Sequence, residues 1–379
     1  MAKFEAKHAG KKKEGGLAGV VAGDSAICTV GIEGRGLSYR GYAIEDLAEK
    51  GSFEEVAWLL TKGEVATAEQ IRDYRARLAE LRTLPEGMTD VLERIPASAN
   101  PMDVLRTAVS YLGNLEPEGP DHGQDQIAEE LIARLPAMLM YWYRWSRDGV
   151  RIDLGVEHED TADYVLRLLT GSKPDDDTRR CIDVSLILYA EHDFNASTFT
   201  SRIITSTMSD FFSAITGAIG ALRGPLHGGA NEAAMYLISK YSSPEEAEKG
   251  LKQSLEKKEK VMGFGHRIYT VSDPRSNIIK EWAKLLSEKA GDTVMYPVAE
   301  RIEQIMWDEK KLFPNLDFYS AVSYHFSGIP TELFTPMFVL SRVAGWAAHV
   351  MEQRSNNRLI RPISRYTGPE QKEYVPLAP

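Results

Sequence analysis

The chain has 379 residues, of which 43% are hydrophobic, 26% charged and 9% aromatic. This composition is typical of a soluble globular protein of about two domains, and it excludes a disordered or fibrous chain. The 45 Lys and Arg residues stand against 55 Asp and Glu residues, which gives a net charge of −10. Because the basic residues do not gather in one block, we expect no nucleic-acid partner. An anionic substrate would need locally concentrated arginines.

The cysteines and the hydrophobic runs indicate the compartment. Cys28 and Cys181 form no CxxC pair, so the sequence favours a reduced, cytoplasmic protein without a disulfide framework. Residues 1–16 contain three consecutive lysines but no apolar segment, which predicts a flexible arm and no secretory signal. Residues 203–222 resemble a membrane span, but Asp210 interrupts them. We therefore expect no membrane segment, and instead one buried helix at a helix or subunit interface.

The first expected element is a β-hairpin. Short strand-like runs at residues 25–30 and 37–40 flank the glycine-rich turn 31–36, and no other part of the sequence gives a clear strand signal. Gly34 and Gly36 lack the third glycine of a dinucleotide-binding fingerprint, so we interpret them as turn residues.

Helix start signals dominate the rest of the chain. Ser52 with Glu55 and Thr67 with Gln70 form capping boxes, in which each side chain binds the other residue's backbone amide. We therefore predict a nearly all-α fold. Three more helices should begin where a capping side chain precedes a proline, at Asn100–Pro101, Ser243–Pro244 and Asp273–Pro274.

Proline and glycine also predict where long segments break. Pro136 lies in the apolar run 127–145, so we expect that helix to be kinked or divided. Turns at residues 223–225 and 328–330 bracket a lysine-rich helical segment. They predict a large helical domain, residues 17–224 and 328–379, and a smaller inserted domain, residues 225–327.

Three histidines stand in loop segments suited to a site: His192 in AEHDFN, His227 in LHGGAN and His266 in GFGH. Neighbouring glycines let a ligand approach an imidazole closely. The helical pattern after His227 places it near a helix N-terminus, which disfavours imidazolium and suits an electrophile that donates to an enolate oxygen. A hydrogen-bonded structural role is an equal alternative for each. Because they lack local ligand spacing, we expect no metal.

Arginines supply the local positive charge. Arg275 opens a helix, where backbone amides already favour an anion, whereas Arg342 lies in a mostly apolar segment and is either paired internally or free for a ligand carboxylate. Arg361 precedes Pro362 in a C-terminal loop. Each of the three alone is more simply explained as a salt-bridged residue.

Asp317 is a lone carboxylate between apolar residues. Burial would raise its pKa and make it a suitable general base. The alternative is that Asp317 caps a helix.

In this order and spacing, these residues resemble the citrate synthase family. The resemblance covers residues 17–370, including YRGY (39–42) and NPMDVLRTA (100–108). The segment NLDFYSAVSY (315–324) is most similar to the bacterial 2-methylcitrate synthase branch. The carrying motifs are AEHDFNAST with His192, GPLHGGANE with His227, MGFGH with His266, DPR with Arg275, PNLD with Asp317 and SRVAGWAAH with Arg342.

The resemblance implies an α-helical homodimer whose smaller domain closes over the substrates. It implies condensation of an acyl-CoA with oxaloacetate, followed by thioester hydrolysis. Coenzyme A thioester is then a co-substrate, and no cofactor is tightly bound.

The resemblance also implies roles for individual residues. Asp317 would remove the α-proton, His227 would hydrogen-bond the thioester oxygen and His266 would act on the oxaloacetate carbonyl. Arg267 is a candidate for the CoA phosphates, although a solvated arginine explains it equally well. Oxaloacetate would be held by His192, Arg275 and Arg342, with Arg361 reaching in from the other subunit.

We expect a 2-methylcitrate synthase that uses propionyl-CoA, with secondary acetyl-CoA activity, and we place Phe318 and Tyr319 at the acyl pocket. The first alternative is an ordinary citrate synthase that prefers acetyl-CoA. An ATP-dependent citrate lyase is disfavoured because its chain is much longer and no GxxxxGK[ST] loop occurs here. A non-catalytic carboxylate-binding helical dimer is disfavoured because Asp317 and His227 are both present.

Overall fold

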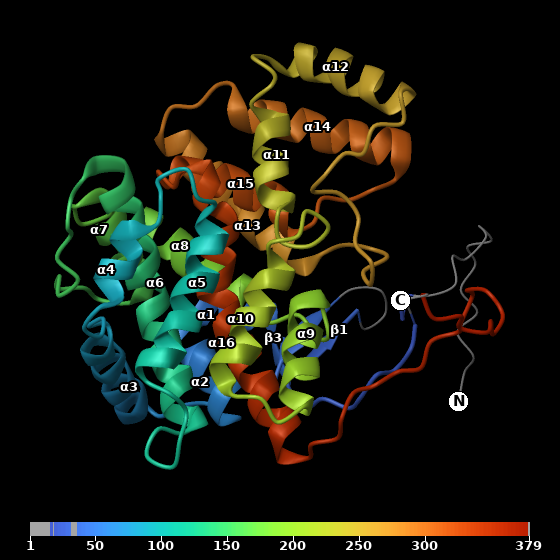
Figure 1. The fold of residues 1–379 in the computed structure, drawn as a ribbon. Coiled ribbons are helices and arrows are strands. Elements are labelled where there is room, and N and C mark those ends of the chain that lie inside the picture. The colour runs from blue at the N-terminus through green and yellow to red at the C-terminus, as the bar shows by residue number, and fades with distance from the viewer. Residues whose placement is uncertain (1–15, 18, 32–35, 378–379) are drawn as a thin grey trace.

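The computed structural model describes residues 16–17, 19–31 and 36–377, and these residues form a mainly helical molecule (Figure 1). The predicted all-α fold with a small N-terminal sheet is confirmed. The predicted N-terminal arm, residues 1–16, lies outside the described residues except for Gly16.

The small sheet has three antiparallel strands in the order β1 (Cys28–Val30), β2 (Leu37–Tyr39) and β3 (Tyr42–Ala43). The predicted hairpin is formed by β1 and β2, with Cys28 opposite Tyr39, while the tip of its turn, residues 32–35, lies outside the described residues. The sequence did not predict β3. A tight turn at Arg40 and Gly41, with φ of 50° and 91°, makes this extra strand possible.

Sixteen α-helices follow within the described residues. The predicted helix starts are confirmed, because Ser52 and Thr67 form both capping boxes and the three residues before a proline each accept a backbone amide. The helices are α1 (Ile44–Lys50), α2 (Phe53–Lys62), α3 (Ala68–Leu81), α4 (Met88–Arg94), α5 (Pro101–Leu115), α6 (Gln124–Asp148), α7 (Thr161–Thr170), α8 (Asp176–Tyr189), α9 (Ala196–Ser206), α10 (Phe211–Leu222), α11 (Ala230–Ile238), α12 (Pro244–Glu256), α13 (Pro274–Lys289), α14 (Met295–Lys310), α15 (Leu316–Phe326) and α16 (Phe334–Ser355).

The expectation of one helix across residues 203–222 is wrong. Helix α9 ends at Ser206 and α10 begins at Phe211. The break occurs because Asp210 is the N-cap of α10 and accepts the Ser213 amide at 2.9 Å. Among the described residues, no helix combines the length and hydrophobicity that a bilayer crossing requires.

Helix α6 runs through Pro136 without division, so the divided form that the sequence allowed is excluded. Proline removes one backbone hydrogen bond from a helix interior. Here the residues from Leu131 to Trp142 are all buried, and their packing offsets that loss.

Helix α16 forms the centre of the core. Its residues from Phe334 to Val350 are all buried, and it contacts α2, α5, α6, α8 and α9. Helices α11, α12 and α14 lie at the top of the molecule in Figure 1, within the segment predicted as an inserted domain. Helix α12 packs on α14, and α13 packs on α15. The exact division into two domains stays a prediction.

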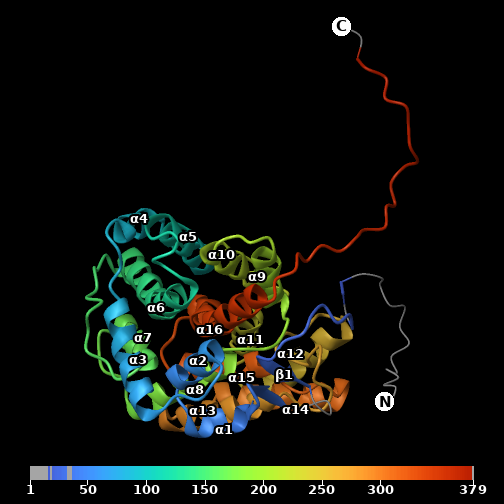
Figure 2. The same cartoon turned by 90° about the horizontal axis from the view of Figure 1, so that it is seen from below.

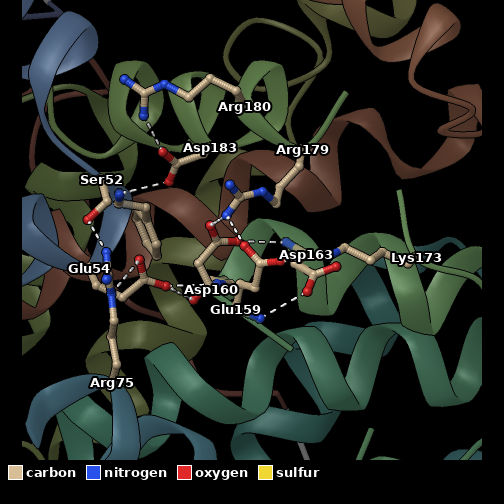
Figure 3. A network of polar contacts seen from close by, with 12 residues as sticks. Ser52, Glu54, Arg75, Glu159, Asp160, Asp163, Lys173, Arg179, Arg180 and Asp183 are labelled. Carbon is tan, nitrogen blue, oxygen red and sulfur yellow. Dashed lines mark hydrogen bonds and ion pairs between the residues drawn. The ribbon is translucent and has the colours of Figure 1, made fainter. Parts of the chain in front are cut away.

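Buried charges tie α2 to α7 and α8 (Figure 3). Glu54 is 1% exposed and accepts hydrogen bonds from the backbone and hydroxyl of Thr161, at 2.7 and 2.6 Å. Asp183 accepts the Phe53 amide at 2.9 Å, and burial raises the pKa of Asp183 to about 7. These contacts fix the position of α8, whose C-terminal end leads into the segment that holds His192.

Candidate active site

Six of the predicted site residues form one connected cluster: His192, His227, His266, Arg275, Asp317 and Arg342. Tyr189 and Phe338 lie between Arg342, His227 and Asp317. The Phe338 ring centroid is 4.7 Å from the Arg342 guanidinium and 6.2 Å from the His227 ring centroid. The Tyr189 hydroxyl donates to Asp317, and its carbonyl accepts from Arg342. The rest of the cluster adjoins Arg275, whose charge affects the pKa values of His192, His266 and Asp317.

The loop between α12 and α13 holds His266 as a neutral imidazole. Its Nδ1 accepts hydrogen bonds from the backbone amides of Ile268 and Tyr269, at 3.1 and 3.2 Å. Burial, and then the Arg275 charge, lowers the pKa of His266 to about 4. Because Nδ1 is an acceptor, the neutral ring carries its proton on Nε2. His266 therefore offers an N–H donor at neutral pH.

His192 stands beside His266, with the ring centroids 5.0 Å apart. Its Nε2 lies 3.1 Å from the Tyr269 hydroxyl, and the side chain is 6% exposed. Burial lowers the pKa of His192 well below its usual value, and the charge of Arg275 adds to this effect. The pair is therefore uncharged at neutral pH.

His227 has the opposite tautomer. Its Nε2 accepts the Ser197 backbone amide at 3.2 Å and lies 2.8 Å from the Ser197 hydroxyl oxygen, so the ring proton is on Nδ1. Burial, and then the charge of Arg342, lowers the pKa of His227 to about 4. Helix α11 does begin three residues later, as expected, but burial and Arg342 are the main causes of the neutral state.

Two glycines allow these segments to meet. A Cβ atom at Gly228, beside His227, would lie 2.4 Å from the Leu222 carbonyl oxygen. A Cβ atom at Gly345 of α16 would lie 2.2 Å from the carbonyl oxygen of Ala190, just before the His192 loop. No real side chain tolerates such contacts, so both positions require glycine.

The two buried arginines differ in what satisfies them. Arg275 donates from Nε and Nη2 to the carboxylate of Asp273, at 3.0 and 2.9 Å, and this pairing keeps it charged. Arg342 is 1% exposed and donates from Nε to the Tyr189 carbonyl at 2.7 Å. Its Nη1 is buried without a hydrogen-bond partner among the described residues. An unpaired buried donor is costly, and a ligand carboxylate would satisfy it.

Asp317 lies in the first turn of α15, where Asn315 rather than Asp317 is the N-cap. The capping alternative is therefore excluded. The carboxylate accepts the Tyr189 hydroxyl at 2.7 Å. Burial raises the pKa of Asp317 to about 6, although the Tyr189 hydrogen bond and the charge of Arg275 oppose this rise. The result is a carboxylate that is ionised at neutral pH and more basic than usual.

The structure does not bring Arg267 and Arg361 into this cluster within one chain. Arg267 is exposed beside His266. Arg361 is exposed in the segment after α16, which Figure 2 shows leaving the helical body. Among the described residues there is no group of three or more His, Cys, Asp or Glu suited to a metal ion.

The residues after Asp317 point in different directions. Phe318 is fully buried, and its ring centroid lies 4.5 Å from that of Phe264. Tyr319 donates its hydroxyl to Glu303 of α14, and the Lys280 ammonium lies over its ring. This geometry does not support the expectation that Tyr319 shapes the acyl pocket.

Sequence reasoning missed several supporting residues: Tyr189, Ser197, Tyr269, Asp273 as a partner of Arg275, and Phe338. Tyr189 stands directly before the AEH motif, but its contact with Asp317 joins α8 to α15 and leaves no local signal. Ser197 follows the N-cap Asn195 and reads as part of a helix start. Such partners become visible only in three dimensions.

A helical fold with three neutral imidazoles, a carboxylate of raised pKa and buried arginines suits a condensing enzyme of the acyltransferase type, and the comparisons with known proteins show that class. The sequence model of the family described as citrate synthase, C-terminal domain, matches residues 16–363. The chain therefore belongs to the citrate synthase family.

Among its relatives, the chain is 54% identical to 2-methylcitrate synthase of Shewanella oneidensis, over 96% of this chain and 97% of the relative. It is 44% identical to 2-methylcitrate synthase 2 of Corynebacterium glutamicum, over 96% of each chain. It is also 42% identical to citrate synthase 2 of Bacillus subtilis, over 96% of this chain and 98% of the relative. Both activities thus occur among similar proteins.

Solved structures agree with the fold. Citrate synthase from Thermotoga maritima has a TM-score of 0.84 at 36% identity. A ternary complex of citrate synthase from Thermoplasma acidophilum with carboxymethyl coenzyme A and oxaloacetate has a TM-score of 0.88 at 31% identity. Each comparison covers 95% of this chain and 97% of the other.

Proposed function

We propose that the protein condenses propionyl-CoA with oxaloacetate and water to give 2-methylcitrate and CoA, with secondary activity toward acetyl-CoA. One observation carries the chemistry: two imidazoles held neutral, each with a defined N–H donor, lie in the same cluster as a carboxylate of raised pKa. The names of the similar relatives support propionyl-CoA as the preferred acyl donor.

The first step is removal of the acyl α-proton by Asp317. The electron pair of the breaking C–H bond moves toward the thioester oxygen, where negative charge develops. In this proposal His227 donates its Nδ1–H to that oxygen. A neutral, preorganised donor in a water-poor site stabilises such charge far more than bulk water does. The raised pKa of Asp317 brings its basicity closer to what the step requires.

The second step forms the new carbon–carbon bond. The nucleophilic α-carbon attacks the ketone carbon of oxaloacetate, and the Nε2–H of His266 donates a hydrogen bond to the ketone oxygen, where negative charge develops. The proton that this oxygen finally carries comes in net from the α-carbon, by way of the Asp317 carboxyl group. Oxaloacetate is a dianion, and guanidinium groups bind carboxylates with good geometry. His192, Arg275 and the unpaired Nη1 of Arg342 are the proposed holders of this substrate. Local arginines thus overcome the net negative charge of the chain.

Hydrolysis completes the reaction. Water attacks the thioester carbonyl, the C–S bond breaks, and CoA leaves as a thiol that carries a proton from the water. A site that closes only after oxaloacetate binds protects acyl-CoA from wasteful hydrolysis. We assign closure to the inserted domain, residues 225–327.

We further propose a homodimer in which Arg361 reaches the partner's site. The segment that carries it exposes Leu359, Ile363 and Tyr366, at 59%, 89% and 76%. Apolar side chains so exposed on an extended segment are typical of a surface that a second subunit covers. Arg267 remains the proposed contact to the CoA phosphates, and Phe318 the proposed wall of the acyl pocket.

The proposed specificity is tested by comparing kcat/KM for propionyl-CoA and acetyl-CoA, each with saturating oxaloacetate, through release of the CoA thiol. We expect a preference for propionyl-CoA of about 10- to 200-fold, the range that one methylene supplies in an apolar pocket. Equal or better use of acetyl-CoA would identify an ordinary citrate synthase. Thiol release with neither substrate would favour the carboxylate-binding alternative.

A further inference from the structure

A tyrosine that no sequence motif identified, Tyr189, contacts the proposed base Asp317. Tyr189 is the last residue of α8 and is 1% exposed. Its hydroxyl donates to Oδ1 of Asp317, on α15, at 2.7 Å. The contact therefore joins two helices that are far apart in the chain, directly at the proposed base.

Tyr189 is held rigidly on both sides. Its backbone carbonyl accepts from Nε of Arg342 at 2.7 Å, and its ring centroid lies 4.5 Å from that of Phe338. Burial keeps the pKa of its hydroxyl well above the usual value, so the group stays a neutral donor. A fixed donor of this kind constrains the carboxylate that it contacts.

A carboxylate has two oxygens, and only one of them can take the substrate proton in a given pose. With Oδ1 bound to the tyrosine, Oδ2 is the oxygen left to the substrate. The hydrogen bond also favours the charged form of Asp317, against the effect of burial. The other charged groups that act on Asp317 are Arg275 of α13, its N-cap residue Asp273, and Arg342 of α16. Tyr324 of α15 is a neutral phenol whose hydroxyl is paired with Ser185, and burial together with the Asp317 charge raises the pKa of Tyr324.

We propose that Tyr189 is the positioning residue of the base: its hydroxyl orients Asp317 through Oδ1, stabilises the carboxylate form through that hydrogen bond and presents Oδ2 to the acyl α-carbon. This inference rests on the proposed function, in which Asp317 removes the α-proton. It adds a residue that acts through Asp317 and that has no covalent role.

The test is the pH dependence of kcat/KM for Tyr189→Phe, measured with propionyl-CoA. Loss of the hydroxyl raises the pKa of Asp317, so less carboxylate is present at a given pH and the acidic limb moves to higher pH. We expect the wild-type limb near pH 6, as the pKa of Asp317 requires, and an upward shift of about one pH unit in the variant. Much of the lost activity should return above the shifted limb.

Tyr324→Phe is the matched control. Tyr324 is also 1% exposed, but its hydroxyl lies 2.7 Å from the Ser185 hydroxyl oxygen. This variant removes one buried hydroxyl from the same pair of helices and should leave the acidic limb unchanged. Urea unfolding of both variants separates loss of stability from loss of orientation.

An infrared titration of the Asp317 carboxyl group, identified by its absence in Asp317→Asn, provides a readout that does not need turnover. The proposal requires its midpoint to rise in Tyr189→Phe and not in Tyr324→Phe. Unchanged midpoints, or equal shifts in both variants, would overturn it. If the wild type releases no thiol, the proposed function fails, while the infrared titration still decides whether Tyr189 controls Asp317.

Discussion

Replacing Arg342 with methionine separates two roles that this buried arginine can have: stabilising the fold and binding oxaloacetate. Arg342 is 1% exposed, and within the described part of the chain its Nη1 has no hydrogen-bond partner, which costs about 1 to 3 kcal/mol. The substitution removes that cost together with the bond from Nε to the Tyr189 carbonyl, worth about 1 kcal/mol. The two effects largely cancel, so we expect the free energy of unfolding to change by no more than about 2 kcal/mol.

The loss of oxaloacetate binding in Arg342→Met should appear as a smaller stabilisation of the variant by this substrate. Loss of a charge-assisted hydrogen bond of about 1.5 to 3 kcal/mol weakens binding about 10- to 100-fold. At an oxaloacetate concentration of 100 times Kd, the wild type gains about 2.7 kcal/mol of stability, whereas a variant with a 100-fold higher Kd gains about 0.4 kcal/mol. Urea unfolding with and without oxaloacetate measures both quantities.

Arg354→Met is the control from the same helix. Arg354 is paired through both Nη atoms with Glu118, at 2.6 and 2.9 Å, so its loss should lower stability without changing the gain from oxaloacetate. The reasoning about Arg342 would be refuted if Arg342→Met lost more than about 3 kcal/mol without ligand, as removal of one partner of a buried ion pair does, and still gained the full stabilisation from oxaloacetate.

Two further predictions concern His227 and Asp317. His227→Ala should lower kcat about 100- to 1000-fold with little change in KM for oxaloacetate, because it removes a preorganised donor to the enolate oxygen; steady-state kinetics check this, and a raised KM at unchanged kcat would contradict it. Asp317→Asn should be more stable than the wild type at pH 8. The pKa of Asp317 is raised to about 6 in the folded chain, so ionising this carboxyl costs the folded chain more free energy than it costs the unfolded chain. The difference in free energy of unfolding between variant and wild type should shrink as the pH falls through 6. It should vanish below about pH 4, where the carboxyl is protonated in both the folded and the unfolded chain. Urea unfolding at several pH values measures this difference, and a difference that does not change with pH would contradict the reasoning.

Local signals predicted the fold well. Each helix start inferred from a capping side chain was confirmed, because a cap binds an amide only two or three residues away. The error at residues 203–222 has the same origin: Asp210 was weighed only as a charge that interrupts a hydrophobic run, although it is also a capping residue. The strand β3 was missed because two residues carry no periodic pattern.

The site was predicted less completely than the fold. The sequence predicted His192, His227, His266 and Asp317 as candidate site residues, because their surroundings are unusual within a few residues. It could not assign tautomers, since these depend on backbone amides such as that of Ser197, which reaches His227 from another element. The role proposed for Arg361 came only from the family resemblance, because its proposed contact is with a second subunit and leaves no signal in the surrounding sequence.

The most direct test of the central claim is formation of 2-methylcitrate from propionyl-CoA and oxaloacetate, followed by mass spectrometry together with thiol release, in the wild type and in Asp317→Asn. The account predicts stoichiometric product and thiol in the wild type and loss of both in the variant. Full activity of Asp317→Asn, or thiol release that does not depend on oxaloacetate, would contradict it.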